Sequence, residues 1–523
     1  MSRINTNVPS LIAQRNLGIN TGKLENALER LSTGLRINRG KDDPAGLIAS
    51  ENLRSEIRGI DAAISNAERA DQVVNIAEGG LQEISNLLVE LQSLVVEASN
   101  TAGISDEEKA ANQLQIDSIL QTIDRVASAT SFQDSKLLNG SLDYTTRDVS
   151  GVVSDFSVRA AKLEFGETRD VDVVVTASAQ RAGYFLSFGA TNLNLGGAGA
   201  TDGANEQFVL ELAGSLGARE LSFSSGATLA DIVAAVNTFR SVTGVSAVVS
   251  GTGLRIDSVG FGSQEFVSLE VRDDGNIGTG SSIGLYGLDP GNTQVASTTL
   301  TSTYANAANG LSDFGQDIEA VINGVRATTS GTVARIATDF LDIELDLRWD
   351  PADPDPGAAR LGGIQALTIT GGGADFQLAS RVNIAGKVSL GIQNVAARSL
   401  GRSVVEVGGA EMVYFVQDLA SGRDLSVVDG DTANAQAVLE RAIRDVSTLR
   451  GRLGAFQKNT IGATINSLGV AFANTTAAES VIRDTDFADE TSRLTQAQVL
   501  QSSAISSLAI ANNAPQNVLQ LLG

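Results

Sequence analysis

The sequence predicts a mixed fold, in which both chain ends form an all-α coiled-coil or bundle rod and a β-rich α+β outer region is inserted between them. Before residue 140 and after residue 431, apolar residues recur at steps of three and four, which is typical of one helix face. Between these points Gly, Ser, Thr and Val are abundant, and a period-two alternation indicates strands and turns. The chain of 523 residues is too long for one core, so we expect roughly two to four domains.

The N-terminal helical pattern is interrupted at residues 38–44. Ahead of this break, leucines recur at Leu17, Leu24, Leu28, Leu31 and Leu35. After it, Pro44 suits the first turn of a new helix, and Asp42 or Asp43 can cap the free N–H groups there. We therefore expect a terminal helix followed by a separate, longer one.

The longer helix needs partners. Its apolar residues step through Leu53 and Ile57, slip near residues 79–80 as at a stutter, and resume through Leu88 and Leu91. About 55 helical residues at roughly 1.5 Å each span about 80 Å, and such a helix cannot bury its apolar face against itself. Helices from elsewhere in the chain must cover it.

Candidate partner helices lie on both sides of the middle region. Ser105 can cap one whose apolar residues run through Val126, and residues 438–456 repeat the same spacing through Leu449 and Leu453. A last helix, at about residues 489–512, carries an alanine every seventh position: Ala497, Ala504 and Ala511. An ordinary bundle explains this spacing. We favour the alternative, in which helices from both ends pair and the termini form a second coiled layer.

These patterns divide the chain into five segments. We expect terminal helical segments at 1–44 and 481–523, rod helices at 45–140 and 431–480, and a β-rich middle at 141–430. Within the middle, two small modules are expected at about 195–275 and 315–350. The first follows the order ββαββ, and the second contains the hairpin signal Asn323-Gly324.

Composition argues against several classes of function. The net charge of −23 and pI near 4.4 disfavour nucleic acid and anionic membranes as partners. The chain has no cysteine and no histidine, so it cannot form disulfides, a Ser-His-Asp or Cys-His site, or a zinc site that needs imidazole. We expect no enzyme activity and no cofactor. Neither a membrane-spanning run nor a cleavable signal peptide is apparent, so we expect a cytosolic chain or one exported without cleavage.

Two stretches of the middle region could suggest ligand sites, and neither has the full pattern. Residues 275–280 are glycine-rich, but no lysine or helix follows to complete a phosphate-binding loop. Asp350, Asp353 and Asp355 alternate with prolines and lack the glycine and distal glutamate of a calcium loop. A rigid polar turn explains them better.

The motifs at both ends resemble those of the bacterial flagellins. At the N-terminus these are residues 4–7 (INTN), 31–38 (LSTGLRIN) and 41–47 (KDDPAGL). At the C-terminus they are residues 484–488 (DTDFA) and 513–522 (NAPQNVLQLL). The resemblance covers about residues 1–140 and 435–523, and the two middle modules resemble small domains of flagellins and hook-associated proteins.

This resemblance implies a structural subunit that polymerises into the extracellular flagellar filament used for swimming. It implies termini that form an inner coiled layer, a rod that makes most subunit contacts, and a middle region that faces solvent. It also implies unfolded export by the flagellar type III apparatus without a cleaved signal. The implied partners are further copies of the chain, the flagellar cap, the junction proteins and an export chaperone.

The residues that we expect to act are apolar ones in the terminal and rod helices. The expected polymerisation interface comprises Leu17, Leu24, Leu28, Leu31, Ile37, Leu494, Leu508, Val518, Leu519, Leu521 and Leu522. Rod packing is expected to involve Leu53, Ile57, Leu88, Leu91, Leu449 and Leu453. In the free monomer we expect the termini to be disordered, because their partners arrive only on assembly.

Many flagellins are recognised by Toll-like receptor 5, through a segment that corresponds here to residues 87–100. Leu94 stands at the position of a contact leucine, but Glu90 replaces an expected arginine, and Gln115 and Ile119 replace a glutamate and an arginine. A reversed charge repels the partner that the arginine attracted, so we expect weak recognition.

Two alternatives remain open for the function of the whole chain: a hook–filament junction protein, and a filament subunit whose middle region is an adhesin.

Overall fold

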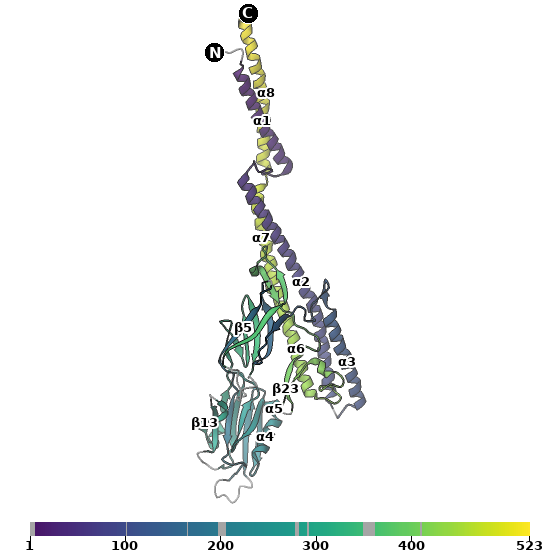
Figure 1. Cartoon of the computed structure of the whole chain (residues 1–523), viewed down its shortest axis with the longest axis vertical. Coiled ribbons are helices and arrows are strands. Elements are labelled where there is room, and N and C mark those ends of the chain that lie inside the picture. Colours follow the sequence, from purple (N-terminus) through teal and green to yellow (C-terminus); the bar gives the residue numbers. More distant parts are fainter. Residues whose placement is uncertain are drawn as a thin grey trace. The chain divides into compact units, whose positions relative to one another are not determined.

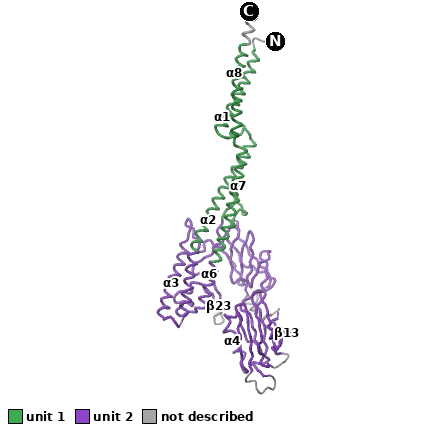
Figure 2. Tube along the Cα trace, turned by 180° about the vertical axis from the view of Figure 1, so that it is seen from behind, with its two compact units in different colours: residues 1–81, 376–388, 447–523 green, residues 82–375, 389–446 purple. Residues whose placement is uncertain are grey.

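The computed structural model describes residues 6–100, 102–164, 166–196, 206–277, 282–289, 292–348, 361–407 and 410–522. The chain divides into two compact units, each built from distant segments (Figure 2). Unit 1 comprises residues 1–81, 376–388 and 447–523, and unit 2 comprises residues 82–375 and 389–446. Within the described residues, no helix is both long enough and apolar enough to cross a membrane.

Unit 1 is built mainly of helices from the two ends of the chain (Figure 1). They are α1 (Val8–Thr33), the first part of α2 (Pro44–Ala98), the end of α6 (Thr432–Ala455), α7 (Gly462–Arg483) and α8 (Phe487–Leu522). A π-helical segment, η5 (Phe456–Ile461), joins α6 to α7. The short 3-10 helix η3 (Ile384–Gly386) lies in the segment 376–388.

Side chains tie the N-terminal and C-terminal helices of unit 1 together. Arg450 Nε lies 2.8 Å from Glu78 Oε1. Gln457 Nε2, in η5, donates to Asp71 Oδ1 at 2.8 Å and to Asn75 Oδ1 at 3.0 Å. The predicted pairing of helices from both chain ends is therefore confirmed.

The helices begin and end where their sequences provide caps. Asn7 Oδ1 accepts from the N–H of Ser10 at the start of α1, and α1 ends at Gly34, whose φ of 74° suits glycine. Of the two candidate caps of α2, Asp43 accepts from the N–H of Gly46. Asp42 instead accepts from the amide of Arg39, and this hydrogen bond lowers the pKa of its carboxyl group.

The stutter that we predicted in α2 is wrong. The buried side chains of α2 alternate steps of three and four without interruption from residue 60 to residue 98. They are Ile60, Ala63, Ala67, Ala70, Val74, Ala77, Leu81, Ile84, Leu88, Leu91, Val95 and Ala98, and Leu94 is buried beside them. The prediction left out Ala70, Val74 and Ala77, which occupy positions of the same heptad pattern between Ala67 and Leu81. The helix passes through residues 79–80 without a break.

Unit 2 contains the remaining helices of the predicted rod and the β-rich middle. α3 (Asp106–Ala129) starts with the predicted cap, in which Ser105 and Glu108 exchange hydrogen bonds. Gln113 fixes α3 to the chain near residue 420: its side-chain nitrogen donates to the Leu419 carbonyl, and its oxygen accepts from Ser426 Oγ and the N–H of Val427. The other short elements of unit 2 are β1 (Ser131–Phe132), β2 (Ser135–Lys136), β23 (Ser403–Val407), β24 (Ala410–Tyr414) and η4 (Val416–Leu419). β21 (Ala374–Gln377) and β22 (Lys387–Leu390) pair with each other, and each has residues in both units.

One core of the middle region is enclosed by two antiparallel sheets. The first has the order β16-β15-β5-β20-β3, and the second has the order β17-β18-β19-β4. Their bounds are β3 (Tyr144–Arg147), β4 (Val153–Ala161), β5 (Arg169–Ala177), β15 (Glu319–Ile322), β16 (Val325–Arg326), β17 (Thr328–Ser330), β18 (Val333–Ala337), β19 (Leu341–Leu347) and β20 (Gly362–Gly372). The stretch 315–350 is therefore not a self-contained module, because β15 pairs with β5 and β19 pairs with β4.

A second core lies between two further antiparallel sheets and a helix. The sheet orders are β13-β12-β6-β10-β9 and β14-β11-β7-β8. Their elements are β6 (Gly183–Ser187), β7 (Gln207–Gly214), β8 (Ala218–Ser224), α4 (Leu229–Thr238), α5 (Arg240–Thr243), β9 (Val245–Ser250), β10 (Gly253–Ser258), β11 (Phe266–Asp273), β12 (Gly284–Asp289), β13 (Asn292–Ser302), η2 (Tyr304–Asn309) and β14 (Leu311–Phe314). The predicted ββαββ order is present from β7 to β10, but its two hairpins belong to different sheets. The core consequently extends well past residue 275.

Candidate polymerisation surface

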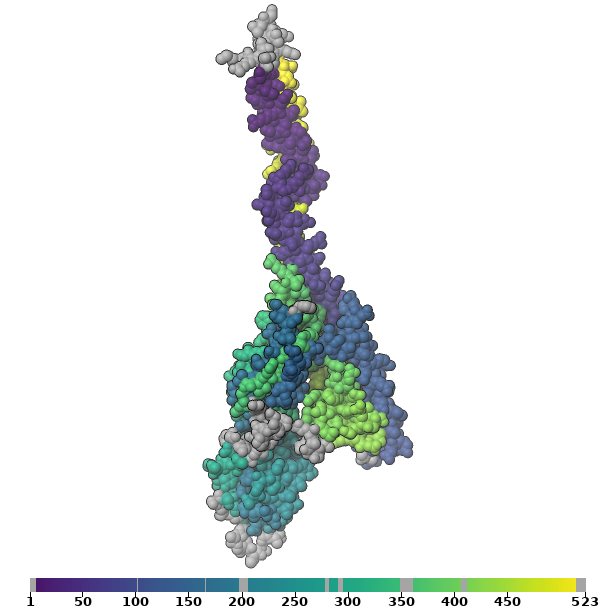
Figure 3. Space-filling view, viewed as in Figure 1, coloured from purple at the N-terminus to yellow at the C-terminus, as the bar shows by residue number. Residues whose placement is uncertain are grey.

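α1 and α8, here called the end-helix pair, run side by side in opposite directions. Asn20 Nδ2 donates to the carbonyl of Leu500 at 3.3 Å, and Arg30 lies 3.6 Å from the buried carboxylate of Glu490. Figure 3 shows yellow α8 along the edge of purple α1. The pair therefore joins the first and last helices of the chain.

Small side chains fill the contact between the two helices. Ala13, Ala27, Ala497 and Ala504 are buried, which fits the close approach expected from an alanine at every seventh position of α8. The larger predicted interface residues lie around this contact. Leu17, Leu24, Leu31, Leu494 and Leu508 are half-buried, and Leu28 is half exposed.

The pair exposes more apolar side chains than the sequence analysis selected. Those exposed on α1 include Val8, Leu11, Ile12 and Ile19, and those on α8 include Val499, Ile505 and Ile510. Large apolar areas are rarely left in water and commonly mark interaction surfaces. The sequence does carry a signal for these additional interface residues. Apolar residues occur on more than one face of each helix, and such helices are buried on several sides.

Ile37 does not belong to the predicted polymerisation interface. Its side chain is only 1% exposed, and a Cβ added at Gly46 would lie 2.7 Å from its Cδ1. Ile37 therefore packs inside the turn between α1 and α2 and is not available to another subunit. Val518, Leu519, Leu521 and Leu522 lie within α8, and their side chains are outside the described part of the structure.

The two end motifs meet where α1 leads into α2 and α7 leads into α8. The N–H of Arg36 donates to the Arg483 carbonyl at 2.7 Å, and the N–H of Thr485 donates to the Gly34 carbonyl at 2.9 Å. The Arg36 guanidinium also donates to the carbonyls of Val481 and Ile482. These are among the last carbonyls of α7, where a cation is favoured by the helix dipole. Backbone hydrogen bonds thus join two motifs that are about 450 residues apart in the sequence.

The predicted rod-packing residues lie in both units. In unit 1, Leu53 and Ile57 are half-buried, and Leu449 and Leu453 are buried. In unit 2, Leu88 and Leu91 are fully buried. Each is thus at least partly covered in the isolated chain.

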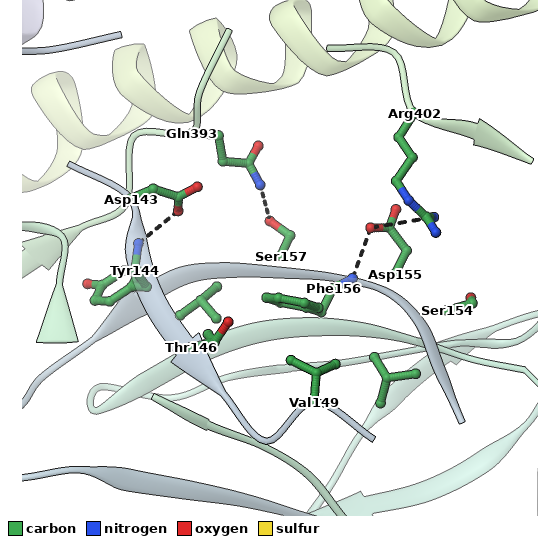
Figure 4. A pocket seen from close by; sticks show the side chains of 12 residues that line it. Asp143, Tyr144, Thr146, Val149, Ser154, Asp155, Phe156, Ser157, Gln393 and Arg402 are labelled. Atoms are coloured by element: carbon green, nitrogen blue, oxygen red, sulfur yellow. Dashed lines mark hydrogen bonds and ion pairs between the residues drawn. The ribbon is translucent and has the colours of Figure 1, made fainter. Parts of the chain in front are cut away.

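Unit 2 also contains a cavity of about 500 Å³ beside β3 and β4 (Figure 4). Its polar lining residues largely bind one another. Gln393 Nε2 donates to Ser157 Oγ at 2.8 Å, and Arg402 lies 4.0 Å from Asp155. Among the described residues, no group of three or more acidic side chains is placed to hold a metal ion. Asp350, Asp353 and Asp355 lie outside the described residues.

Comparison with known proteins identifies the family. The sequence model of the bacterial flagellin N-terminal helical region matches residues 4–143, that of the C-terminal helical region matches residues 436–522, and the flagellin hook IN motif matches residues 207–259. The chain is 30% identical to the B-type flagellin of Pseudomonas aeruginosa, 28% to a flagellin of Salmonella muenchen and 27% to flagellin A of Vibrio anguillarum, each alignment covering 99% of both chains. Similarity to flagellins over the whole length favours a filament subunit over a junction protein. The chain belongs to the bacterial flagellin family and is a structural subunit of the flagellar filament.

Proposed function

We propose that the chain polymerises outside the cell through the apolar surface of its end-helix pair. The observation that carries this proposal is the combination of an alanine-lined contact inside the pair with exposed Leu, Ile and Val side chains around it. Alanines line the contact between the two helices, so the larger side chains remain at least partly exposed for neighbouring subunits. Burying each of them would contribute up to about 1.5–3 kcal/mol, depending on how much is still exposed.

Charge opposes assembly in this proposal. Copies that each carry a net charge of −23 repel one another, and salt screens that repulsion. Polymer formation from purified chain should therefore become more favourable as salt is added. The middle region, with its two independent cores, is proposed to face solvent, because neither core is needed to complete the end-helix pair.

The proposed partners follow from the family. They are further copies of the chain, the flagellar cap, the junction proteins and an export chaperone for the C-terminal segment, with export through the type III apparatus. Weak recognition by Toll-like receptor 5 is part of the proposal. Glu90 and Gln115 are exposed, whereas Leu94 is buried within the subunit and Ile119 is also covered. A receptor approaching this segment would meet a carboxylate and little of the leucine.

A complementation experiment tests the proposal in cells. The bacterium that produces this chain, deprived of its own flagellin gene, is given the unaltered gene, Ile12→Glu or Leu216→Glu. Leu216 is a matched control, because it is an exposed aliphatic side chain in the middle region. We expect sheared extracellular filaments and swimming with the unaltered chain and with Leu216→Glu, and neither with Ile12→Glu. Normal filaments from Ile12→Glu would refute an interface on the end-helix pair.

A further inference from the structure

The alanines between α1 and α8 do not determine how far one helix is shifted along the other. Ala497, Ala504 and Ala511 recur every seven residues, so a slip of α8 by seven residues would place one alanine where another had been. Such a slip would move Ile505 and Ile510 by about 10 Å along the pair. A filament interface made by these side chains requires one register, and repetitive coiled coils commonly set it with a polar residue.

Asn7 makes a polar contact of this kind at the open end of the pair. Its Oδ1 accepts from the N–H of Ser10 at 3.1 Å and so caps α1. Its Nδ2 donates to the carbonyl of Ala511, in α8, at 2.8 Å. Beside it, the buried Ser10 donates through Oγ to Asn512 Oδ1 at 2.7 Å. One amide side chain thus fixes the start of α1 to a particular turn of α8.

The acceptor of this hydrogen bond is unusual within α8. A helical carbonyl normally accepts from the N–H four residues later, but residue 515 is a proline and has no N–H. α8 nevertheless continues to Leu522. Asn7 supplies a donor in place of the N–H that Pro515 lacks. By contrast, Asn20 donates to the carbonyl of Leu500, and the residue four positions after that, Ala504, has its own N–H.

We propose that Asn7 is a positioning residue that sets the register of the end-helix pair by satisfying the Ala511 carbonyl that Pro515 leaves open. A slip by seven residues would place Asn7 opposite Ala504, whose carbonyl has the N–H of Leu508 available four residues on. The hydrogen bond therefore favours one register over its repeats. Arg30 and Glu490 mark the same register at the other end of the pair. The proposal rests on polymerisation through the end-helix pair, since that is where register has a consequence.

The first test compares critical concentrations for polymer formation. Asn7→Ser keeps a good helix cap without charge but is too short to reach Ala511. It should raise the critical concentration about fivefold, the effect of one hydrogen bond. Asn20→Ser is the matched control and should change it less than about twofold, because the Leu500 carbonyl keeps a helical donor. In a Pro515→Ala background, the restored N–H should reduce the effect of Asn7→Ser to that of the control.

The second test reads register directly, and the chain's lack of cysteine makes it clean. Gln501 Nε2 donates to Thr21 Oγ1 at 3.4 Å, so T21C with Q501C should form an intramolecular disulfide in filaments. T21C with L494C or with L508C reports slips of seven residues in either direction. Adding Asn7→Ser should increase the slipped disulfides at the expense of T21C/Q501C.

The outcomes separate this proposal from the one on which it rests. It is overturned if Asn7→Ser assembles like the unaltered chain, raises the critical concentration no more than Asn20→Ser does, or leaves the disulfide pattern unchanged. An equal rise in critical concentration for Asn7→Ser with and without Pro515→Ala would also overturn it. If Pro515→Ala alone blocks assembly, two measurements still test the register proposal. They are the critical concentrations of Asn7→Ser and Asn20→Ser and the pattern of disulfides. Failure of the unaltered chain to form any polymer would overturn the proposed function, and this inference with it.

Discussion

Replacement of Leu11 by alanine measures how much an exposed side chain of the end-helix pair contributes to assembly. Leu11 is 57% exposed in the subunit, so more than half of its surface remains to be buried by neighbours. Full burial of a leucine contributes about 1.5–3 kcal/mol, and the exposed share corresponds to about 1 kcal/mol. Because each 1.4 kcal/mol is a factor of ten, Leu11→Ala should raise the critical concentration about fivefold.

The assay is sedimentation of polymer from a dilution series of purified chain after seeding. Leu216→Ala is the matched control, because Leu216 is 67% exposed and lies in the middle region. It should leave the critical concentration unchanged, and both variants should keep the unfolding temperature of the unaltered monomer. An unchanged value for Leu11→Ala, or an equal rise for Leu216→Ala, would show that the exposed face of α1 is not an interface.

Three further predictions concern unit 2. Gln113→Leu should lower the unfolding temperature of the monomer, with a loss of about 2–4 kcal/mol, because it leaves the Leu419 carbonyl and the Val427 N–H without this partner; calorimetry checks this against exposed Gln115→Leu, which should cost little. Burial raises the pKa of Asp313 in the folded chain, so the ionised carboxylate lowers the free energy of unfolding at neutral pH. This destabilisation decreases as the pH falls through the raised pKa, because the carboxyl group then becomes protonated. Asp313→Asn should therefore raise the unfolding temperature at about pH 7 more than at about pH 4, and an equal gain at both would contradict the assigned cause. Purified monomer should activate cells that express Toll-like receptor 5 weakly, and Glu90→Arg should strengthen the response; strong activation by the unaltered chain at nanomolar concentration would refute this.

The ends of the chain were the most predictable part, because helix signals are local. Pro44, Ser105 and the spacing around Leu449 each indicate helices within a few residues, and the structure has helices there. The end of α8 was less predictable. We predicted that it stops near residue 512, and proline usually terminates a helix, but α8 continues through Pro515 to Leu522. The donor that compensates, Asn7, is about 500 residues away in the sequence.

The middle region was predictable in its elements and not in their pairing. The strand and helix signals from residue 207 to residue 258 are correct, yet nothing local shows that β7 pairs with β11 or that β10 pairs with β6. Strand partners are set by which faces bury together, and that depends on distant segments. The same limit explains Ile37, whose burial depends on the turn that brings Gly46 against it.

The most direct test of polymerisation through the chain ends is negative-stain electron microscopy of the purified full-length chain after seeding or salting out. A deletion of residues 1–40 serves as the comparison, since it removes all of α1 and leaves both β cores intact. We predict long tubes of uniform diameter from the full chain and none from the deletion, which should still fold. Tubes from the deletion would contradict assembly through α1, and full-length chain found only as monomers or as short caps on existing filaments would contradict its role as the filament subunit.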